Sequence, residues 1–304
     1  MEKVVPFFGN AIERTPAAAI FLSGSGSNAE RILALWQEKG EDAGFRVGAL
    51  VTDNPEGSRT RELARQFGVP LVENDIRAFY RERGETRVSI ATPAGRTLRE
   101  AWTEAVRAAL RPFQPDFGVL AGFVPLTNLT GDFPCLNVHP GDLTYLKDGR
   151  RHLVGLHTVP VERAILEGLD SLRSSVIVAQ PYTGAGDNMD SGPILGISEE
   201  VPIDLGETPL DRLAAVAARR PPRRPPGGYG DELESIAQRH LEALKRGGDW
   251  VVFPPVVADF ARGRFALDDK GALLYRLAGG WQPIATVVYG NGTRELVFRG
   301  EEAP

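Results

Sequence analysis

A glycine-rich turn between an apolar run and a helical pattern places the strongest constraint on how this chain can fold. The apolar run covers residues 17–22, the turn reads SGSGSNA over residues 23–29, and the helical pattern continues to residue 39. This order of elements leaves free backbone N–H groups at the positive end of a helix, which is where an anion binds. The turn also matches the spacing GxGxxA, so it can hold either the pyrophosphate of a dinucleotide or a simple phosphate ester.

A dinucleotide site also requires an acidic residue near the end of the second strand, about 20 positions further on. Asp53, which directly precedes Asn54 and Pro55, meets this requirement. A match to this spacing is weak evidence, because glycine turns also serve only to let a helix pack closely on a strand. Dinucleotide binding, phosphate-ester binding and a purely structural turn therefore stay open at this point.

Strand-like and helix-like patterns alternate through the first two thirds of the chain. The predicted strands cover residues 17–22, 45–51, 70–72, 117–121, 135–138, 174–179 and 193–197. The predicted helices cover residues 28–39, 58–67, 97–111 and 158–168, while residues 80–95 have the composition of a polar loop. This alternation predicts an α/β fold with a Rossmann-like, mainly parallel sheet flanked by helices.

The last third of the chain is predicted to add a C-terminal α+β extension. A helical pattern covers residues 231–246, a short helix begins at Phe253, a hairpin covers 265–277, and strands follow over 281–299. We therefore divide the chain into a catalytic domain (1–200), a helical continuation (201–264) and a small β-rich extension (265–304). The Pro-Arg segment, RRPPRRPPGGYG over residues 219–230, is predicted to be a disordered insertion rather than a lid, because consecutive prolines forbid helix.

Composition excludes several classes of function. The 304 residues carry a formal net charge of −5, which offers no general attraction to nucleic acids or membrane surfaces. Cys135 is the only cysteine, so neither an intrachain disulfide nor a multi-cysteine metal site can form. The first residues lack a secretory signal, and no apolar run reaches the ~18 residues that a membrane helix needs. We therefore predict a cytoplasmic protein that acts on small molecules.

An amide, an imidazole and a carboxylate form the candidate catalytic set. Asn137 and His139 stand two positions apart at the end of a predicted strand, so both side chains point to the same face of the sheet. Asp190 lies in the loop DNMDSGP, just before another predicted strand. Such a set suits acyl transfer to an amine, because the amide donates to the developing oxyanion while the carboxylate holds the imidazole protonated as a second donor.

Each of these residues also has an ordinary structural interpretation. A buried histidine can bond to backbone, and Asn and Asp often form turns, so the hypothesis depends on the combination rather than on one residue. His139, His152 and His157 could contribute to a metal site, but no tight ligand motif such as HExxH occurs. We therefore predict no metal.

Taken in order, the sequence motifs resemble those of the folate-dependent formyltransferase family, most closely the phosphoribosylglycinamide formyltransferases of purine synthesis. The resemblance spans roughly residues 18–263 and rests on SGSGSN (23–28), VTDNP (51–55), ARQFGV (64–69), LAGF (120–123), NVHP (137–140), GLHT (155–158), AILEG (164–168) and DSGPI (190–194). It implies the formyltransferase fold of that family, in which helices flank a central sheet and the folate cleft lies between the N-terminal half and the part that follows.

The resemblance also implies roles for particular residues. Asn137, His139 and Asp190 would be the catalytic trio, and the phosphate of the amine substrate would be held by Gly24, Ser25, Gly26, Ser27 and Asn28. The formyl donor would be 10-formyltetrahydrofolate. The pocket for its pterin would be lined by Phe123, Val124, Leu126, Gly186, Asp187, Asn188 and Met189. His157 would support the cleft, or merely orient the loop at the start of a helix.

The implied activity is transfer of a formyl group from 10-formyltetrahydrofolate to a primary amine of a phosphorylated substrate, which we predict to be glycinamide ribonucleotide. Another amine, such as an amino sugar nucleotide, and hydrolysis of the donor by water are alternatives within the family. A nucleotide-binding oxidoreductase is the alternative from a different class. The tRNA-directed members carry a basic C-terminal domain, and this acidic chain shows no equivalent basic stripe, so we predict no nucleic-acid partner.

Three departures from the family pattern bear on the substrate. Residues 124–127 read VPLT where the family commonly has a run that contains arginine, so contacts to the folate side chain differ. Residues 139–152 form a longer connection that brings three basic residues close to the trio; these bind a phosphate or the folate glutamate, or form a solvated charged loop. The acidic residue by which the family holds the ribose is not evident around residues 238–240.

Overall fold

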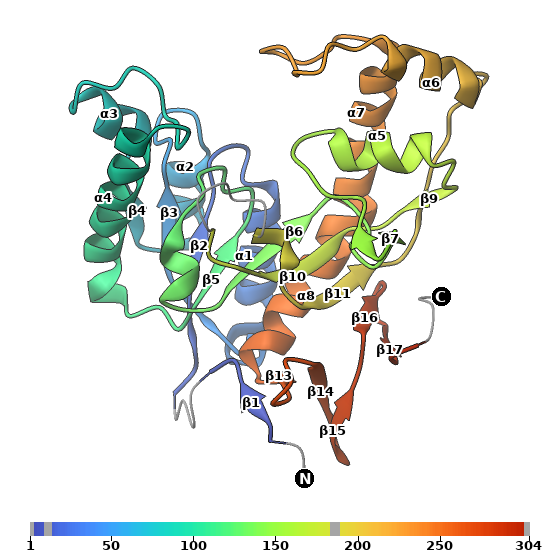
Figure 1. Cartoon of the computed structure of the whole chain (residues 1–304). Coiled ribbons are helices and arrows are strands. Elements are labelled where there is room, and N and C mark those ends of the chain that lie inside the picture. Colours follow the sequence, from blue (N-terminus) through green and yellow to red (C-terminus); the bar gives the residue numbers. More distant parts are fainter. Residues whose placement is uncertain (1–2, 9–13, 183–188, 301–304) are drawn as a thin grey trace.

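The computed structural model describes residues 3–8, 14–182 and 189–300. Across these residues a nine-stranded sheet forms the centre of the molecule, in the order β17-β16-β11-β10-β6-β5-β2-β3-β4 (Figure 1). Its strands are β2 (Ala17–Phe21), β3 (Arg46–Thr52), β4 (Leu71–Glu73), β5 (Phe117–Leu120), β6 (Cys135–His139), β10 (Ser175–Ala179), β11 (Ile194–Ser198), β16 (Thr286–Tyr289) and β17 (Arg294–Val297).

The strands of this sheet are mainly parallel, as predicted. The β3–β4, β2–β3, β2–β5, β5–β6 and β11–β16 pairs are parallel. Strand β10 runs antiparallel to both of its neighbours, β6 and β11, and β17 runs antiparallel to β16. The carboxyl ends of β2, β5 and β6 therefore meet at one edge of the sheet, where α/β proteins place their ligands.

Helices cover both faces of the sheet. They are α1 (Ser27–Lys39), α2 (Thr60–Phe67), α3 (Ile76–Arg81), α4 (Pro93–Leu110), α5 (Val159–Leu166), α6 (Leu210–Ala218), α7 (Glu232–Leu244) and α8 (Trp250–Ala261). Figure 1 shows α3 and α4 at one side of the molecule and α5, α6 and α7 at the other. Within the described part of the chain, no helix is both long enough and apolar enough to cross a membrane.

Strand β2 explains why the apolar run in the sequence is uninterrupted. Ala18 and Ile20 pack in one core cluster together with α1 and α8. Ala19 and Phe21 point to the opposite face and pack in a second cluster with α4. A strand that is buried on both faces reads as a continuous apolar stretch rather than an alternating one.

Two helical segments differ from the prediction. Residues 80–95 were expected to be a polar loop, but α4 begins at Pro93, after Thr92 accepts a hydrogen bond from the Gly95 N–H at 3.1 Å. Polar composition hid this helix start, because the cap and the first-turn proline are themselves polar or turn-forming residues. Helix α8 begins at Trp250 rather than at Phe253, so two prolines lie inside it; burial of its apolar side chains outweighs the cost of about 3 kcal/mol for an interior proline.

The C-terminal strands divide between two sheets. Strands β13 (Phe265–Leu267), β14 (Leu273–Leu277) and β15 (Gly280–Pro283) join β1 (Val5–Pro6) in a four-stranded antiparallel sheet. Strands β16 and β17 instead continue the main sheet beyond β11. The fully buried carboxylate of Asp259 on α8 accepts hydrogen bonds from Tyr275 (3.0 Å), Tyr289 (2.9 Å) and Arg294 (2.6 Å), which fixes these strands to the core. The predicted domain boundaries stay a prediction.

The Pro-Arg segment is tied to the neighbouring helices by ion pairs, in contrast to the disorder predicted for it. Arg220 pairs with Glu162 on α5 and with Asp231, the latter at 2.7 Å. Arg224 pairs with Glu234 on α7. The prolines do prevent a helix, as expected, but the arginines between them supply the contacts that composition alone does not reveal.

Candidate active site

The carboxyl end of β6 carries two of the predicted catalytic residues. Asn137 is half-buried and lies between Leu120 of β5 and Ile177 of β10 in the sheet register. His139, two residues further on, is only 3% exposed. Alternation along the strand directs both side chains to one face, as the sequence predicted.

The third predicted residue, Asp190, lies next to His139 although the two are far apart in the sequence. Asp190 belongs to a short 3₁₀ turn (Met189–Ser191) that precedes β11. One of its carboxylate oxygens, Oδ2, is 3.7 Å from His139 Nδ1. This separation is longer than a hydrogen bond, so the two groups face each other without being directly bonded.

The hydrogen bond on the other side of the imidazole fixes its tautomer. His139 Nε2 is 2.7 Å from the carbonyl oxygen of Leu153. Because a carbonyl can only accept, Nε2 carries the proton, and Nδ1 presents a lone pair whenever the ring is neutral. Burial lowers the pKa of His139, while nearby Asp190 acts to raise it. Burial therefore favours the neutral ring in the unliganded protein, whereas the sequence-based hypothesis has His139 protonated.

The hairpin formed by β7 (Leu146–Lys147) and β8 (Arg150–Arg151) positions both members of this pair. The Arg151 guanidinium donates to the backbone oxygen of Asp190 and, at 2.7 Å, to that of Gly192. Burial lowers the pKa of Arg151, and Asp190 opposes that shift. Leu153, just after the hairpin, accepts the bond from His139. The long connection that distinguished the sequence from the family thus holds the site together.

The glycine turn has the geometry that its sequence predicts. Helix α1 begins at Ser27, and Gly26 before it has φ 65°. Among the described residues, no side chain caps this helix start. A Cβ at Gly26 would lie 2.7 Å from Leu22 Cδ1 and 2.8 Å from Leu63 Cδ1, so only glycine fits. The turn therefore offers uncapped N–H groups to an anion.

All five residues predicted to bind phosphate line one cavity of about 270 Å³. The cavity is lined by Ser23, Gly24, Ser25, Gly26, Ser27, Asn28, Ala121, Gly122, Val124 and Lys245. Lys245 belongs to a π-helical turn (Lys245–Asp249) between α7 and α8, and it brings a positive charge to the anion-binding loop. Sequence reasoning missed Lys245, because nothing local to residue 245 marks its approach to residue 24.

Asp249, at the end of the same π-helical turn, holds the glycine loop through the side chain of Asn28. Its carboxylate accepts from Asn28 Nδ2 at 2.9 Å and from Ser174 Oγ at 2.6 Å. Burial raises the pKa of Asp249, and both hydrogen bonds oppose that shift. Asn28 Oδ1 is also buried and finds no hydrogen-bond partner in the part of the chain that is described. Asp249 therefore fixes the side chain of Asn28, and the acidic residue that would hold a ribose stays unassigned.

The carboxylate of Asp53, the acidic residue at the end of β3, is not available to bind a ribose. Its carboxylate is 6% exposed and accepts a hydrogen bond of 2.5 Å from Ser23 Oγ. Ser23 Oγ in turn accepts from the Val124 N–H at 2.9 Å. Burial raises the pKa of Asp53. These contacts join the ends of β2, β3 and β5, so Asp53 has the structural role of a strand-end residue rather than the ribose-binding role of a dinucleotide site.

The residues predicted to contact the pterin have different environments. Phe123 is half-buried and stacks on Trp102, with ring centroids 6.3 Å apart. Val124 is 77% exposed and lines the loop cavity, whereas Leu126 is half-buried. Met189 lies beside Asp190 in the 3₁₀ turn. The predicted Gly186, Asp187 and Asn188 lie outside the described residues.

His157 lies at the start of α5 and is exposed, with φ 58°, a value uncommon for residues other than glycine. Its predicted supporting role stays a prediction. Across residues 3–8, 14–182 and 189–300, no three or more His, Cys, Asp or Glu side chains gather in a group that could hold a metal ion.

Comparison with solved structures identifies the fold. Phosphoribosylglycinamide formyltransferase from Anaplasma phagocytophilum matches with a TM-score of 0.54 and 18% identity, over 90% of this chain and 99% of that one. The same enzyme from Coxiella burnetii matches with a TM-score of 0.54 and 16% identity, over 86% and 94% of the two chains. Glycinamide ribonucleotide transformylase 1 from Symbiobacterium toebii matches with a TM-score of 0.54 and 21% identity, over 84% and 92%.

No family model and no curated protein sequence matches the chain. The similarity to these solved structures therefore concerns the fold, which is formyltransferase-like: a mainly parallel sheet flanked by helices, with an antiparallel sheet added at the C-terminal end. The fold class predicted from the sequence is confirmed.

Proposed function

From this formyltransferase-like fold and the geometry around β6, we propose that the protein transfers a formyl group from 10-formyltetrahydrofolate to a primary amine of a phosphorylated substrate, with glycinamide ribonucleotide as the acceptor. One observation carries the proposal: His139 and Asp190 face each other 3.7 Å apart at the carboxyl end of β6, beside Asn137. The glycine loop, which we propose binds the phosphate, follows β2 at the same edge of this sheet.

In the proposed reaction the amine nitrogen of the acceptor attacks the formyl carbon. Asn137, whose side chain makes no hydrogen bond within the described part of the chain, donates its amide to the formyl oxygen as negative charge develops there. His139 accepts the proton that the amine loses, because its Nδ1 carries a lone pair in the neutral ring. Asp190 then stabilises the imidazolium across the 3.7 Å gap.

The second half of the reaction breaks the bond between the formyl carbon and N10 of the donor. The proton taken up by His139 passes to N10 through water at Asp190, so the protein ends the cycle in its starting protonation state. This order differs from the sequence-based hypothesis in one respect. His139 begins as a neutral base and becomes a cation during the reaction, because burial disfavours a permanent charge there.

The acceptor and the donor would bind on either side of these residues. The loop from Gly24 to Asn28 would hold the phosphate, with Lys245 adding charge and Asp249 fixing the Asn28 side chain. Val124, Leu126 and the loop that includes Met189 would contact the pterin. The buried Asp53 argues for a phosphate ester rather than a dinucleotide at the loop, because its carboxylate is engaged by Ser23.

One assay tests the proposal and its alternatives together. The protein is incubated with 10-formyltetrahydrofolate and a panel of phosphorylated amines, with water alone as the control. Transfer to an amine supports the proposal, formate release without an amine indicates a hydrolase, and no turnover combined with stabilisation by NAD(H) indicates an oxidoreductase. Asn137→Ala and His139→Ala should each lower turnover on the order of a hundredfold while still binding the donor. Wild-type rates in either variant would contradict the assignment.

A further inference from the structure

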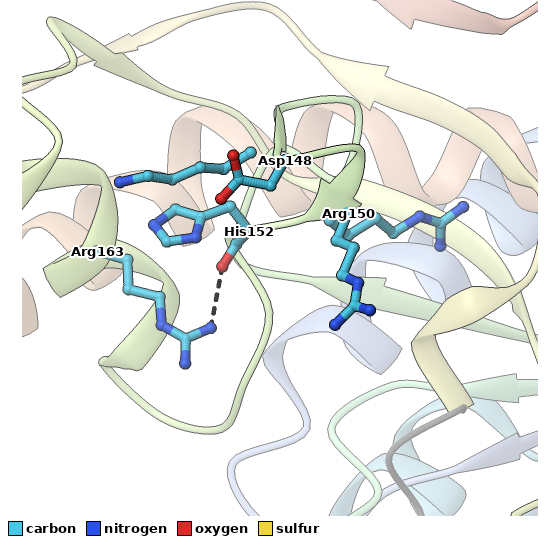
Figure 2. Close-up of a pocket in the computed structure, with 6 residues that line it drawn as sticks. Asp148, Arg150, His152 and Arg163 are labelled. Atoms are coloured by element: carbon cyan, nitrogen blue, oxygen red, sulfur yellow. Dashed lines mark hydrogen bonds between the residues drawn. The ribbon is translucent and has the colours of Figure 1, made fainter.

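A second cavity, which we call the hairpin pocket, opens beside the β7–β8 hairpin. It has a volume of about 600 Å³ and is lined by Lys147, Asp148, Arg150, Arg151, His152 and Arg163. Arg163 comes from α5, and the other lining residues come from the hairpin and the residue after it. Figure 2 shows Arg163 beside His152 on one side of the hairpin and Arg150 on the other side. None of these six belongs to the catalytic set or to the phosphate loop.

Two of the basic groups in the hairpin pocket already have a carboxylate partner. Lys147 Nζ lies 2.6 Å from Glu167 Oε1, and His152 Nε2 lies 3.1 Å from the same oxygen. This pairing neutralises the lysine. It leaves the charge of the pocket to the three arginines.

The three arginines have no carboxylate within ion-pair distance among the described residues. Arg151 donates only to the backbone oxygens of Asp190 and Gly192. Arg163 donates only to the backbone oxygens of His152 (2.9 Å) and Val154 (2.7 Å); the first of these bonds is the dashed line in Figure 2. Arg150 is exposed, and its side chain has no hydrogen bond or ion pair in the part of the chain that is described. Neutral carbonyls hold two of the guanidinium groups in place without cancelling their charge.

We propose that the hairpin pocket binds an oxyanion, a carboxylate or a phosphate, carried by one of the two substrates of the proposed reaction. Guanidinium groups match such anions in shape and charge, and each can donate two parallel hydrogen bonds. Like charges gathered in one cavity repel one another, and a bound anion relieves that repulsion. Among the described residues, Asp148 is the one carboxylate that lines the pocket, against three arginines that make no ion pair.

The position of the hairpin pocket relates it to the chemistry. Arg151 lines the pocket and also holds the backbone of Asp190, and His152 lies next to Leu153, which holds His139. The residues that line the pocket therefore either make the contacts that hold His139 and Asp190 or directly precede a residue that makes them. This inference rests on the proposed function for the identity of the molecule that carries the anion, but not for the presence of the anion site itself.

Equilibrium binding experiments test separately whether the pocket binds an anion and which substrate carries that anion. Wild-type protein is titrated with inorganic pyrophosphate, with 10-formyltetrahydrofolate carrying one or five glutamates, and with acceptors that have or lack a phosphate. Arg150→Gln is the decisive variant, because Arg150 supports no other contact and its replacement leaves the fold intact. Arg163→Gln is the second variant, and Arg81→Gln on α3 is the matched control, since Arg81 is also exposed.

We expect Arg150→Gln to weaken binding of at least one anionic probe by about tenfold, while Arg81→Gln changes nothing. A loss confined to the five-glutamate donor assigns the pocket to the donor's carboxylates, and a loss confined to phosphorylated acceptors assigns it to a phosphate. Equal binding by wild type, Arg150→Gln and Arg163→Gln overturns the proposal, as does an equal loss in Arg81→Gln. These titrations need no turnover, so an inactive protein would refute the proposed function while leaving the pocket testable through pyrophosphate.

Discussion

The glycine loop and the hairpin pocket both present positive potential, but they build it from different groups. The loop uses backbone N–H groups at the start of α1, and its shape is set by Gly26, which is enclosed by Leu22 and Leu63. The hairpin pocket uses guanidinium groups from strand β8 and from α5, of which Arg150 is exposed. The comparison teaches that one site is fixed by core packing, whereas the other is fixed by a few carbonyl contacts and can change with single side chains.

The two regions differ in how they are held and in their contact with the proposed catalytic pair. The hairpin holds His139 through Leu153 and Asp190 through Arg151. The loop is held from the other direction, through Asn28 and Asp249. We propose that each region binds an anion, while Asn137, His139 and Asp190 carry out the chemistry.

The largest expected effect is the loss of formyl-transfer rate on replacement of Asp190, with substrate binding kept. Asp190→Asn keeps the size of the side chain and removes its charge, so it should lower single-turnover formyl transfer on the order of a hundredfold. Affinities for both substrates, measured by titration, should stay within about twofold. A parallel loss of both affinities would instead show that Asp190 only shapes the loop before β11.

Next in size is the effect of adding a side chain to the glycine loop. Gly26→Ala places a Cβ 2.7 Å from Leu22 in a left-handed backbone conformation, so it should lower the free energy of unfolding by about 1–3 kcal/mol. Gly24→Ala is the matched control, because a Cβ there has no atom within 4 Å. Arg150→Gln in the hairpin pocket should leave stability within about 0.5 kcal/mol of wild type. Urea denaturation distinguishes these outcomes, and equal stability of the two glycine variants would contradict the packing argument.

A smaller effect concerns pH. Burial lowers the pKa of His139 from its usual 6.5, so the folded protein holds the neutral ring over a range in which the unfolded chain already takes up a proton. Unfolding therefore binds protons as the pH falls below 6.5, and the free energy of unfolding decreases in that direction. Transfer should decline on the same side, because the protonated ring cannot act as a base. Denaturation and rate profiles between about pH 5 and 8 test this, and His139→Gln should flatten this part of the stability profile.

The smallest predicted effect is a difference between the two regions in how strongly salt weakens anion binding. Exposed guanidinium groups are screened strongly, since the Debye length falls from about 10 Å at 0.1 M to about 3 Å at 1 M salt. Anion binding at the hairpin pocket should therefore weaken several-fold over this range. Binding at the loop, where backbone N–H groups carry the contact, should weaken less. An identical salt dependence in the wild type and in Arg150→Gln would show that Arg150 contributes no charge to binding.

Much of the fold was accessible from local pattern. The apolar run over residues 17–22 predicted strand β2, and the glycine turn predicted the start of α1 to within one residue. The start of α4 and the interior prolines of α8 were missed, because a cap hidden among polar residues and a gain from burial leave little trace in periodicity.

The sequence by itself determined the α/β class, the glycine turn before α1 and the common face of Asn137 and His139, because these follow from periodicity and from the conformational freedom of glycine. Only the tertiary structure decided that Asp190 faces His139 across 3.7 Å and that His139 is buried, which lowers its pKa. It also decided that Asp249 supports the loop and that three arginines share one pocket. The physical reason is that these features depend on burial and on contacts between distant segments, and neither quantity is a property of any local stretch of sequence.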